Sequence, residues 1–316
     1  MNNQLELSII IPASNEEGNL RPLIEGISKS CQSYSFEVLI IDDGSTDSTL
    51  AEALQLSKND QKIRVIKLRK RFGQTAALAA GIDHAQSPIL VTIDGDGQND
   101  PQDIPNLIQE LKKGYDVVSG WREHRKDSLI TRKIPSWCAN AIISWVTGIS
   151  LHDYGCTLKA YRASLIKDIE MFGEMHRFLP AWCAWRGGKI TEIPVRHYAR
   201  KRGHSKYGIL RIFKVLIDLM TLKFFSGYLF KPNHLFSGSA FFFFGLSLLS
   251  GGLAFYDKFG PDRFASYRIP LLLLAGILGV VSILLILLGF VTELMVRLYF
   301  SIRDQKPYII DHENEI

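Results

Sequence analysis

Two long uncharged runs near the C-terminal end constrain this chain more than any other feature. They cover Leu235–Phe255 and Ile269–Val291, and neither contains Asp, Glu, Lys or Arg. At about 1.5 Å per residue, each run is long enough as a helix to cross the ~30 Å hydrocarbon core of a bilayer. Buried helices of soluble proteins seldom run so far without a charge, so the sequence predicts two transmembrane helices.

The remaining composition describes an ordinary folded domain. Of 316 residues, 47% are hydrophobic and 22% are charged, with a formal net charge of +5. This excludes a disordered chain and leaves room for one large or two modest domains. Four cysteines occur without CxxC spacing, so we expect reduced packing residues and neither a disulfide nor a zinc site. They are Cys31, Cys138, Cys156 and Cys183.

The distribution of basic residues around the two runs predicts their orientation. Six Lys or Arg residues flank the outer ends of the runs, whereas the connecting loop at 256–268 has three. The apolar run Leu7–Ile11 stops at Pro12 and is too short for a signal peptide. Both observations predict that the two termini and the domain before residue 205 lie in the cytoplasm.

Short apolar runs alternate with helical patterns in the first part of the chain. We expect strands at Leu7–Ile11, Glu37–Ile41, Ile63–Leu68 and Ile89–Ile93, and helices at Leu20–Ser30, Thr49–Leu56, Thr75–Ala85 and Ile104–Lys113. This alternation predicts an α/β fold with a parallel sheet covered by helices on both faces. Ligands of such sheets bind beyond the carboxyl ends of the strands, and a polar loop follows each expected strand here.

The loop after the fourth strand has the residues of a metal site. Asp94 and Asp96 place two carboxylates two positions apart, with glycines between and after them, and Gln98 adds a carbonyl oxygen. Such hard oxygen ligands suit a divalent ion that also binds phosphate oxygens. A plain turn built from Asp and Gly is the alternative.

Asp42 and Asp43 end the second strand without a phosphate-binding glycine pattern. The sequence contains neither GxGxxG nor a Walker motif, which argues against a dinucleotide or P-loop site. Carboxylates in this place suit hydrogen bonds to a nucleobase or a ribose. Capping of the helix that begins near Asp47 is the alternative role for either one.

The ordered motifs as a set resemble a known family. PASNE, DDGSTD, RFGQTAALAAG and DGDGQNDP follow the four strands in turn, and GWR, DYGCTLKAYR, HRFLPAW and RKRGHSKYG come later. The set resembles family-2 glycosyltransferases with a GT-A fold. Together with the two apolar runs, it resembles polyisoprenyl-phosphate glycosyltransferases, the group of dolichol-phosphate mannosyltransferases and bactoprenol glucosyltransferases. The resemblance covers essentially the whole chain.

The resemblance implies roles for particular residues. The nucleotide would be bound by Pro12, Asn15, Glu16, Asp42, Asp43 and Gly73. Mg²⁺ or Mn²⁺ would be held by Asp94, Asp96 and Gln98, with Asp96 also catalytic. Phosphate contacts would come from Arg122, Arg200 and Lys206, and Asp153 corresponds to the residue usually proposed as the catalytic base.

Physical chemistry favours a different role for Asp153. A phosphate monoester has a second pKa near ~6, so a lipid phosphate is largely a dianion at neutral pH and needs positioning more than deprotonation. We therefore expect Asp153 to orient a basic residue that binds the acceptor, or the sugar hydroxyls.

A basic stretch before the first apolar run supports a phosphate acceptor. Between Ile193 and Ile217 there are seven Lys or Arg residues and no acidic residue. Nucleic acid or a solvated face also suits such a run, but its place beside a membrane anchor favours anionic lipid. The apolar residues from Ile209 onward then predict amphipathic helices lying in the membrane interface.

These expectations define the domains. We expect a cytoplasmic GT-A catalytic domain at 1–205, juxtamembrane amphipathic helices at 206–232, a two-helix transmembrane anchor at 233–292 and a cytoplasmic tail at 293–316. We expect the protein to be a homo-oligomer in the plasma or inner membrane, without a nucleic-acid partner.

The expected reaction is the inverting transfer of one sugar from a nucleotide-sugar to undecaprenyl or a related polyprenyl phosphate. Glucose from UDP-glucose is the donor that the resemblance favours. GDP-mannose and UDP-4-amino-arabinose are alternative donors. A catalytically silent membrane adaptor that binds nucleotide-sugars is the alternative class, although such a protein should have lost the acidic pair that is present here.

Overall fold

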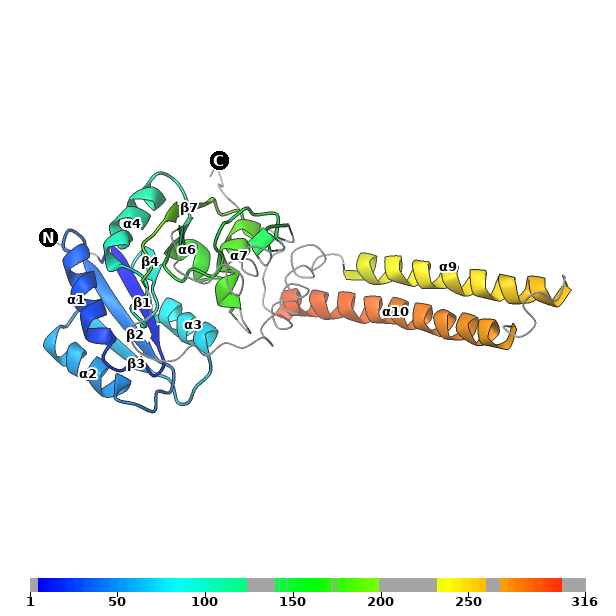
Figure 1. The fold of residues 1–316 in the computed structure, drawn as a ribbon, viewed down its shortest axis with the longest axis horizontal. Coiled ribbons are helices and arrows are strands. Elements are labelled where there is room, and N and C mark those ends of the chain that lie inside the picture. Colours follow the sequence, from blue (N-terminus) through cyan, green and yellow to red (C-terminus); the bar gives the residue numbers. More distant parts are fainter. Residues whose placement is uncertain are drawn as a thin grey trace. The chain divides into compact units, whose positions relative to one another are not determined.

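The structure is a computed structural model that describes residues 5–123, 140–198 without 142, 146, 172 and 174, 232–259 and 268–302. The chain divides into two units, 1–215 and 216–316. The first is an α/β unit and the second contains a pair of helices (Figure 1). The expected amphipathic segment, apart from Pro232, and the tail after Ile302 lie outside the described residues, so the domain boundaries at these places stay predictions.

One mixed sheet forms the centre of the first unit. Within the described residues its strands are β1 (Leu7–Ala13), β2 (Phe36–Asp42), β3 (Ile63–Lys67), β4 (Ile89–Thr92), β5 (Val117–Trp121), β6 (Lys159–Arg162) and β7 (Ile190–Pro194). Their order is β3-β2-β1-β4-β6-β5-β7. Only β6 runs antiparallel to its neighbours β4 and β5, and the other pairs are parallel.

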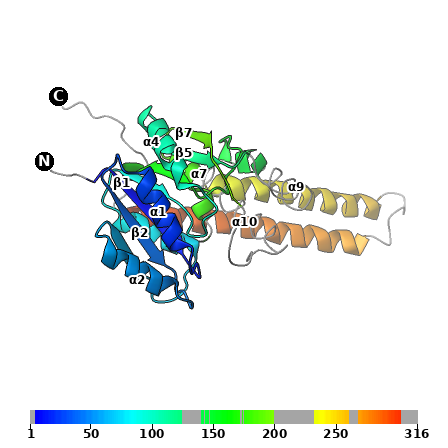
Figure 2. The same cartoon turned by 60° about the vertical axis from the view of Figure 1, so that its left-hand side comes forward.

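Helices cover both faces of the sheet, as the alternating pattern predicts. They are α1 (Leu20–Ser30), α2 (Thr49–Asn59), α3 (Gln74–His84), α4 (Ile104–Lys112), α6 (Ala163–Ile166) and α7 (Leu179–Trp185). Successive β1 side chains point to opposite faces, so Ile9 and Ile11 join a core with α1, α2 and α4. Ile10 lies in a second core with α3, α6 and α7. Figure 2 shows α1 lying along the strands β1 and β2.

A glycine lets α3 lie close against the sheet. A Cβ at Gly81 would come within 2.3 Å of Cγ2 of Ile10. Because no other residue fits this distance, α3 packs directly on β1, and its first turn is held at the carboxyl edge of the sheet. That turn contains Gln74 and Thr75, two polar side chains that contact the loops described below.

The expected elements of the first 113 residues are all present, with bounds that differ by at most three residues. The antiparallel strand β6 was not expected, because its partners β4 and β5 lie far from it in the sequence. The fold is therefore α/β with a mostly parallel sheet. Three of the cysteines, Cys31, Cys156 and Cys183, are buried and free, as expected, and Cys138 lies outside the described residues.

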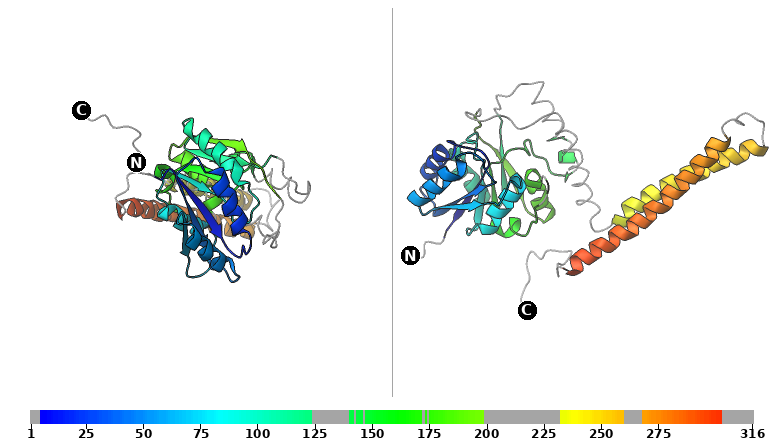
Figure 3. Two further views of the ribbon diagram at one scale, coloured as in Figure 1. Left: turned by 90° about the vertical axis from the view of Figure 1, so that its left-hand side faces the viewer. Right: turned by 90° about the horizontal axis from the view of Figure 1, so that it is seen from below.

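The second unit contains two long helices, α9 (Pro232–Phe259) and α10 (Arg268–Ile302), which lie side by side (Figure 3). Each extends beyond the expected span at both ends. Three serine hydroxyls donate hydrogen bonds of 2.7–2.9 Å to main-chain carbonyl oxygens of the other helix: Ser247 to Ala275, Ser250 to Leu271 and Ser282 to Ala240. These bonds satisfy the hydroxyl groups without water, as a lipid environment requires.

The outer surface of this helix pair is apolar. Both helices are long and apolar enough to cross a membrane. Many of their large side chains are exposed, for example Phe241 at 70% and Leu273 at 63%. Helices from the core of a soluble protein would bury these groups, so the structure favours membrane helices over that alternative.

Candidate active site

The loop after β4 brings two carboxylates together at the carboxyl edge of the sheet. Asp94 is partly buried and accepts a 2.8 Å hydrogen bond from Nε2 of Gln74. Asp96 is buried and accepts a 3.0 Å bond from the Gln98 main-chain N–H. Burial, and then the charge of Asp96, raise the pKa of Asp94 to about 7. The two groups therefore repel each other at a place where water cannot screen them fully.

This acidic pair fits a divalent cation. In the described residues, no group of three His, Cys, Asp or Glu side chains is placed to hold a metal ion by itself. An ion bound by Asp94 and Asp96 would thus need further oxygen atoms from a ligand, and phosphate oxygens serve this purpose in many sites. Such an ion would also remove the repulsion between the two carboxylates. Mg²⁺ and Mn²⁺ both prefer these oxygen ligands.

A later segment of the chain holds the acidic loop in place. The main-chain N–H of Tyr198 donates to the Gln98 carbonyl oxygen at 2.8 Å, and Nε2 of Gln98 donates to the Tyr198 carbonyl oxygen at 3.3 Å. Arg196 donates to Asp103 through Nε at 3.1 Å and Nη2 at 2.8 Å. The side chain of Gln98 is thus anchored on the segment at 196–198, beside the acidic pair.

The two aspartates at the end of β2 have different surroundings. The carboxylate of Asp43 accepts main-chain N–H bonds from Phe72 at 2.6 Å and Gly73 at 2.9 Å, so it joins the loops after β2 and β3. Asp42 is fully buried, and its Oδ2 has no hydrogen-bond partner among the described residues. Neither residue caps α2, because Asp47 accepts the Thr49 N–H at 3.0 Å instead.

The loop after β1 contacts the loop after β2. Asn15 has a φ of 57°, and its Oδ1 accepts the Thr46 main-chain N–H at 2.8 Å. Glu16 accepts a 2.9 Å bond from Nδ2 of Asn19, and its charge contributes to the raised pKa of Asp94. Pro12 lies beside Asp94 in the same cavity. The residues expected to bind the nucleotide therefore line one edge of the sheet.

Arg122 and Asp153 form a bidentate ion pair beside the acidic loop. Nε of Arg122 lies 2.6 Å from Oδ2 of Asp153, and Nη2 lies 2.9 Å from Oδ1. The Gly155 main-chain N–H donates a third bond to Asp153, at 3.1 Å. Both side chains are largely buried, and the paired carboxylate raises the pKa of Arg122 even though burial opposes this. Asp153 is thus the partner that fixes the Arg122 guanidinium.

The neighbours of this pair are fixed as well. The His152 ring stacks on Trp121 with centroids 4.4 Å apart and an interplanar angle of 21°. Glu192 of β7 accepts the His152 main-chain N–H at 2.9 Å and also contacts the His152 ring. The segments that carry Arg122 and Asp153 are therefore joined twice, by the stack and by the ion pair.

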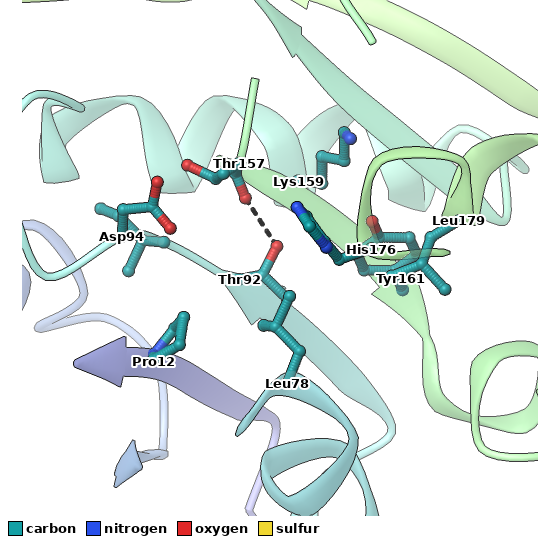
Figure 4. Close-up of a pocket in the computed structure, with 10 residues that line it drawn as sticks. Pro12, Leu78, Thr92, Asp94, Thr157, Lys159, Tyr161, His176 and Leu179 are labelled. Carbon is teal, nitrogen blue, oxygen red and sulfur yellow. Dashed lines mark hydrogen bonds between the residues drawn. The ribbon is translucent and has the colours of Figure 1, made fainter. Parts of the chain in front are cut away.

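A narrow cavity behind Asp94 contains polar groups to which the motifs assigned no role (Figure 4). Thr92 donates to the Thr157 carbonyl oxygen at 2.7 Å, and Nδ1 of His176 lies 2.7 Å from the Thr75 hydroxyl. Lys159 is buried, donates to the Tyr154 carbonyl oxygen at 3.1 Å, and has a pKa lowered by burial to about 8. Lys159 lies in DYGCTLKAYR, His176 in HRFLPAW and Thr75 in RFGQTAALAAG, and this is the only sequence signal for them.

The structure thus brings most of the expected site residues to one edge of the sheet. The residues expected to bind the nucleotide and the metal, and the Arg122–Asp153 pair, all follow the carboxyl ends of strands or lie next to them. Arg200 and Lys206, expected to contact phosphate, lie outside the described residues. This arrangement of an α/β sheet, an acidic pair and a fixed guanidinium is the one expected of a glycosyltransferase of the GT-A class.

Comparison with known proteins gives the family. Residues 8–170 match the model of glycosyl transferase family 2. The chain is 43% identical over 312 residues to the dodecaprenyl-phosphate galacturonate synthase of Rhizobium johnstonii, covering 97% of this chain and 92% of that protein. It is 38% identical over 219 residues to the undecaprenyl-phosphate 4-deoxy-4-formamido-L-arabinose transferase of Salmonella choleraesuis, covering 68% of this chain and 67% of that protein.

A solved structure shows the same fold at low sequence identity. The glucosyl-3-phosphoglycerate synthase from Mycobacterium tuberculosis, in complex with Mn²⁺, uridine diphosphate and phosphoglyceric acid, has a TM-score of 0.54 and 17% identity. The match covers 70% of this chain and 78% of that one. The chain belongs to glycosyl transferase family 2. The resemblance to polyprenyl-phosphate glycosyltransferases is confirmed, since both named relatives are of that kind.

Proposed function

We propose that this glycosyltransferase moves one sugar from a nucleotide-sugar to a polyprenyl phosphate at a membrane surface. The observation that carries the proposal is the position of the Asp94–Asp96 pair beside the fixed Arg122 guanidinium, in a chain with two membrane-length helices. The first group suits the donor diphosphate and the second suits the acceptor phosphate. Two relatives named for polyprenyl-phosphate products support this assignment.

The donor would bind across the loops after β1, β2 and β4. Asp94 and Asp96, with Gln98 beside them, would hold Mg²⁺ or Mn²⁺, which neutralises the diphosphate and so helps it to leave. Asp42, whose buried Oδ2 has no partner among the described residues, would lie beside the nucleoside. Asp43 already accepts two main-chain N–H bonds, so its main contribution is to hold the loop that contains Gly73.

Arg122 would bind the acceptor phosphate. A guanidinium group has five N–H donors, and the ion pair with Asp153 uses two of them. The remaining donors are held in a fixed direction, because the side chain is buried and bidentate. A guanidinium fixed in this way binds a phosphate oxygen without a further loss of side-chain freedom.

Asp153 would act as a positioning residue and not as a general base. Both of its oxygens accept hydrogen bonds from Arg122, and one also accepts the Gly155 N–H. The polyprenyl phosphate, with a second pKa near ~6, is already a nucleophile at neutral pH. A single displacement by this phosphate on the anomeric carbon would invert the configuration, and the electron pair of the broken bond would leave with the diphosphate.

The relatives suggest a donor other than the one expected from the sequence. The relative that spans most of the chain is named for galacturonate, and the second is named for 4-deoxy-4-formamido-L-arabinose. We therefore propose a nucleotide-activated uronic acid of the galacturonate type as the donor, with the arabinose derivative second. Glucose from UDP-glucose has no support from these relatives and ranks after both.

The same proposal includes the location of the enzyme. With the catalytic unit and both termini in the cytoplasm, the site would meet nucleotide-sugars where cells make them. The basic flanks of the two apolar helices support this orientation. The oligomeric state stays a prediction.

A donor panel tests the function directly. The purified full-length protein is incubated with undecaprenyl phosphate and labelled nucleotide-sugars carrying galacturonate, 4-deoxy-4-formamido-arabinose, glucose or mannose, with and without Mn²⁺. We expect a lipid-linked product from the uronate donor, and none from the Asp96→Asn variant. If no donor gives a lipid-linked product, or if Asp96→Asn matches the parent protein, the proposal is wrong.

A further inference from the structure

The loop after β3 carries an exposed cluster of three cations and an aromatic ring. Arg69, Lys70 and Arg71 are all exposed, and the Phe72 side chain is 56% exposed. The Lys70 ammonium group lies 5.2 Å from the centre of the Phe72 ring. Among the described residues, none of the three cations has an acidic partner. We call residues 69–72 the basic loop.

The surrounding sequence reinforces this charge. From Gln61 to Ile82 the chain has six Lys or Arg residues and no acidic residue. Arg64 of this segment is paired with Glu37 at the amino edge of the sheet, but the three cations of the basic loop have no acidic partner among the described residues, and their positive field attracts anions. The partner of the basic loop must therefore come from outside it.

The main chain of the basic loop is held firmly although its side chains are not. The Asp43 carboxylate accepts the N–H groups of Phe72 and Gly73, and the Leu68 N–H donates to the Asp42 carbonyl oxygen at 2.9 Å. Gly44 packs so closely that a Cβ there would lie 2.5 Å from the Arg71 nitrogen. An exposed phenylalanine and three cations are thus presented in a fixed conformation, which lowers the entropy lost on binding.

The basic loop lies at the same edge of the sheet as the acidic pair and follows a different strand. Both follow the carboxyl ends of parallel strands, β3 and β4. The two strands are separated by β2 and β1, so their ends are about 14 Å apart at ~4.8 Å per strand. The chain approaches the acidic pair directly after the basic loop, where Nε2 of Gln74 donates to Asp94 at 2.8 Å.

We infer that the basic loop binds the anionic headgroup layer of the bilayer in which the two long helices lie, with Phe72 inserted among the lipids. The inference rests on the proposed function, because an acceptor phosphate attached to a lipid requires the carboxyl edge of the sheet to reach the headgroups. Three cations match the negative charge of such a surface, and an apolar ring between them enters its outer region. The basic loop thus holds the carboxyl edge of the sheet, where the site lies, on the membrane.

A spin label measures this contact without depending on activity. A nitroxide is attached to Phe72→Cys, in full-length protein with Cys138→Ser, in nanodiscs of phosphatidylcholine alone or with about 30% phosphatidylglycerol. We expect the anionic nanodiscs to increase collisions of the label with oxygen and to reduce collisions with a water-soluble nickel complex. When the labelled protein also carries R69Q, K70Q and R71Q, the anionic nanodiscs should no longer change these collision rates. The matched variant with K29Q, K58Q and K112Q, which loses the same charge at exposed positions elsewhere, should retain it.

Kinetics distinguish a lipid partner from the donor nucleotide. In anionic nanodiscs the three-charge variant of the basic loop should raise the KM for polyprenyl phosphate about tenfold, since each cation near such a surface contributes a severalfold effect. Its KM for the donor should match that of the parent protein. In neutral detergent the variant and the parent protein should transfer the sugar at the same rate.

Two results overturn the inference. One is a label equally exposed to water in both nanodiscs. The other is a basic-loop variant whose defect is a raised KM for the donor, which would assign the cations to the nucleotide-sugar. A parent protein that inserts the label but makes no lipid-linked product would refute the proposed function and leave the membrane contact standing.

Discussion

Buried carboxylates occur at both edges of the central sheet, and their partners differ. At the amino edge, Glu37 of β2 is 3% exposed and accepts bonds from the Ser8 hydroxyl at 2.7 Å, Arg64 at 2.7 Å and the Gln86 N–H at 2.8 Å. Burial alone would raise the pKa of Glu37, but these hydrogen bonds lower it. The carboxylate is fully satisfied by the protein itself.

At the carboxyl edge the partners are incomplete. Oδ2 of Asp42 has no partner among the described residues, and the pKa of Asp94 is raised to about 7 by burial and by Asp96. Strand β2 thus carries a satisfied carboxylate, Glu37, near its amino end, and at its carboxyl end Asp42, one oxygen of which has no partner among the described residues. The comparison teaches that a buried acidic residue belongs to the scaffold when the protein supplies its partners, and to a site when a ligand must supply them.

The sharpest test of this difference is Asp94→Asn. We expect activity to fall about a thousandfold, the scale for loss of a charge that stabilises the reacting phosphates. The same substitution should raise the unfolding free energy of the metal-free protein at pH 8. A folded pKa above the unfolded value means that ionised Asp94 opposes folding, increasingly from about pH 4 to about pH 7. Product formation and thermal unfolding at pH 4 and pH 8 measure both effects. Lower stability at pH 8 would contradict the comparison.

The ion pair at the carboxyl edge gives the next largest effect. Arg122→Lys keeps the charge but cannot form the bidentate contact with Asp153, so we expect about a hundredfold lower kcat/KM for polyprenyl phosphate. Asp153→Asn should be impaired at every pH from 6 to 9, because its loss disturbs Arg122 and removes no proton acceptor. Recovery of the Asp153→Asn rate at high pH would instead establish base catalysis.

At the amino edge we expect a substitution to lower stability and to leave activity unchanged. Glu37→Gln should lower the unfolding free energy at pH 7 by about 1–3 kcal/mol, because it weakens buried hydrogen bonds. The kcat of the folded protein should not change. Since the folded pKa lies below the ordinary value of 4.5, the stabilisation is present above that pH and is lost as the pH falls through the folded pKa. The unfolding free energies of the parent protein and of Glu37→Gln, measured by denaturant titration, should therefore become equal at acidic pH.

Alanine substitutions of two glycines compare the loops at the two edges, and they have the smallest expected effect on stability. Gly44 has a φ of +63°, and a Cβ there would meet the Arg71 nitrogen at 2.5 Å, whereas Gly114 has a φ of +106° with nothing within 4 Å. Gly114→Ala should cost about 1 kcal/mol from backbone strain alone. Gly44→Ala should cost roughly 1 kcal/mol more, because the loop after β3 must also shift. Equal losses would mean that the basic loop is not held by this contact.

Much of the fold was predictable because its signals are local. The apolar runs Leu7–Ile11 and Ile89–Ile93 have the pattern of buried strands, and each is followed by turn residues that mark its end. Strand β6 was not predictable, since its antiparallel pairing joins Lys159 to Thr92 and Ser119, residues far apart in the sequence. No local pattern records such a pairing.

The candidate site likewise contains residues that the sequence predicted and residues that only the structure placed there. Asp94 and Asp96 stand two positions apart after an expected strand, and from this spacing and place the sequence predicts a divalent-ion site, with a plain turn as the alternative. For Asp153 the sequence left open which basic residue it contacts, and the structure pairs it with Arg122. Lys159 and His176 carried no local signal of a role, because only the packing of β6 and the segment at 175–177 places them behind Asp94.

By itself the sequence determined the parallel strands, their covering helices, the acidic pair and two helices of membrane length, because each depends on residue types at short spacing. Only the tertiary structure decided which carboxylates lack partners. Glu37 and Asp42 are both acidic residues of β2, yet Ser8, Arg64 and Gln86 reach one of them and nothing among the described residues reaches Oδ2 of the other. Partners come from distant segments, and their distances are set by the packing of the whole sheet.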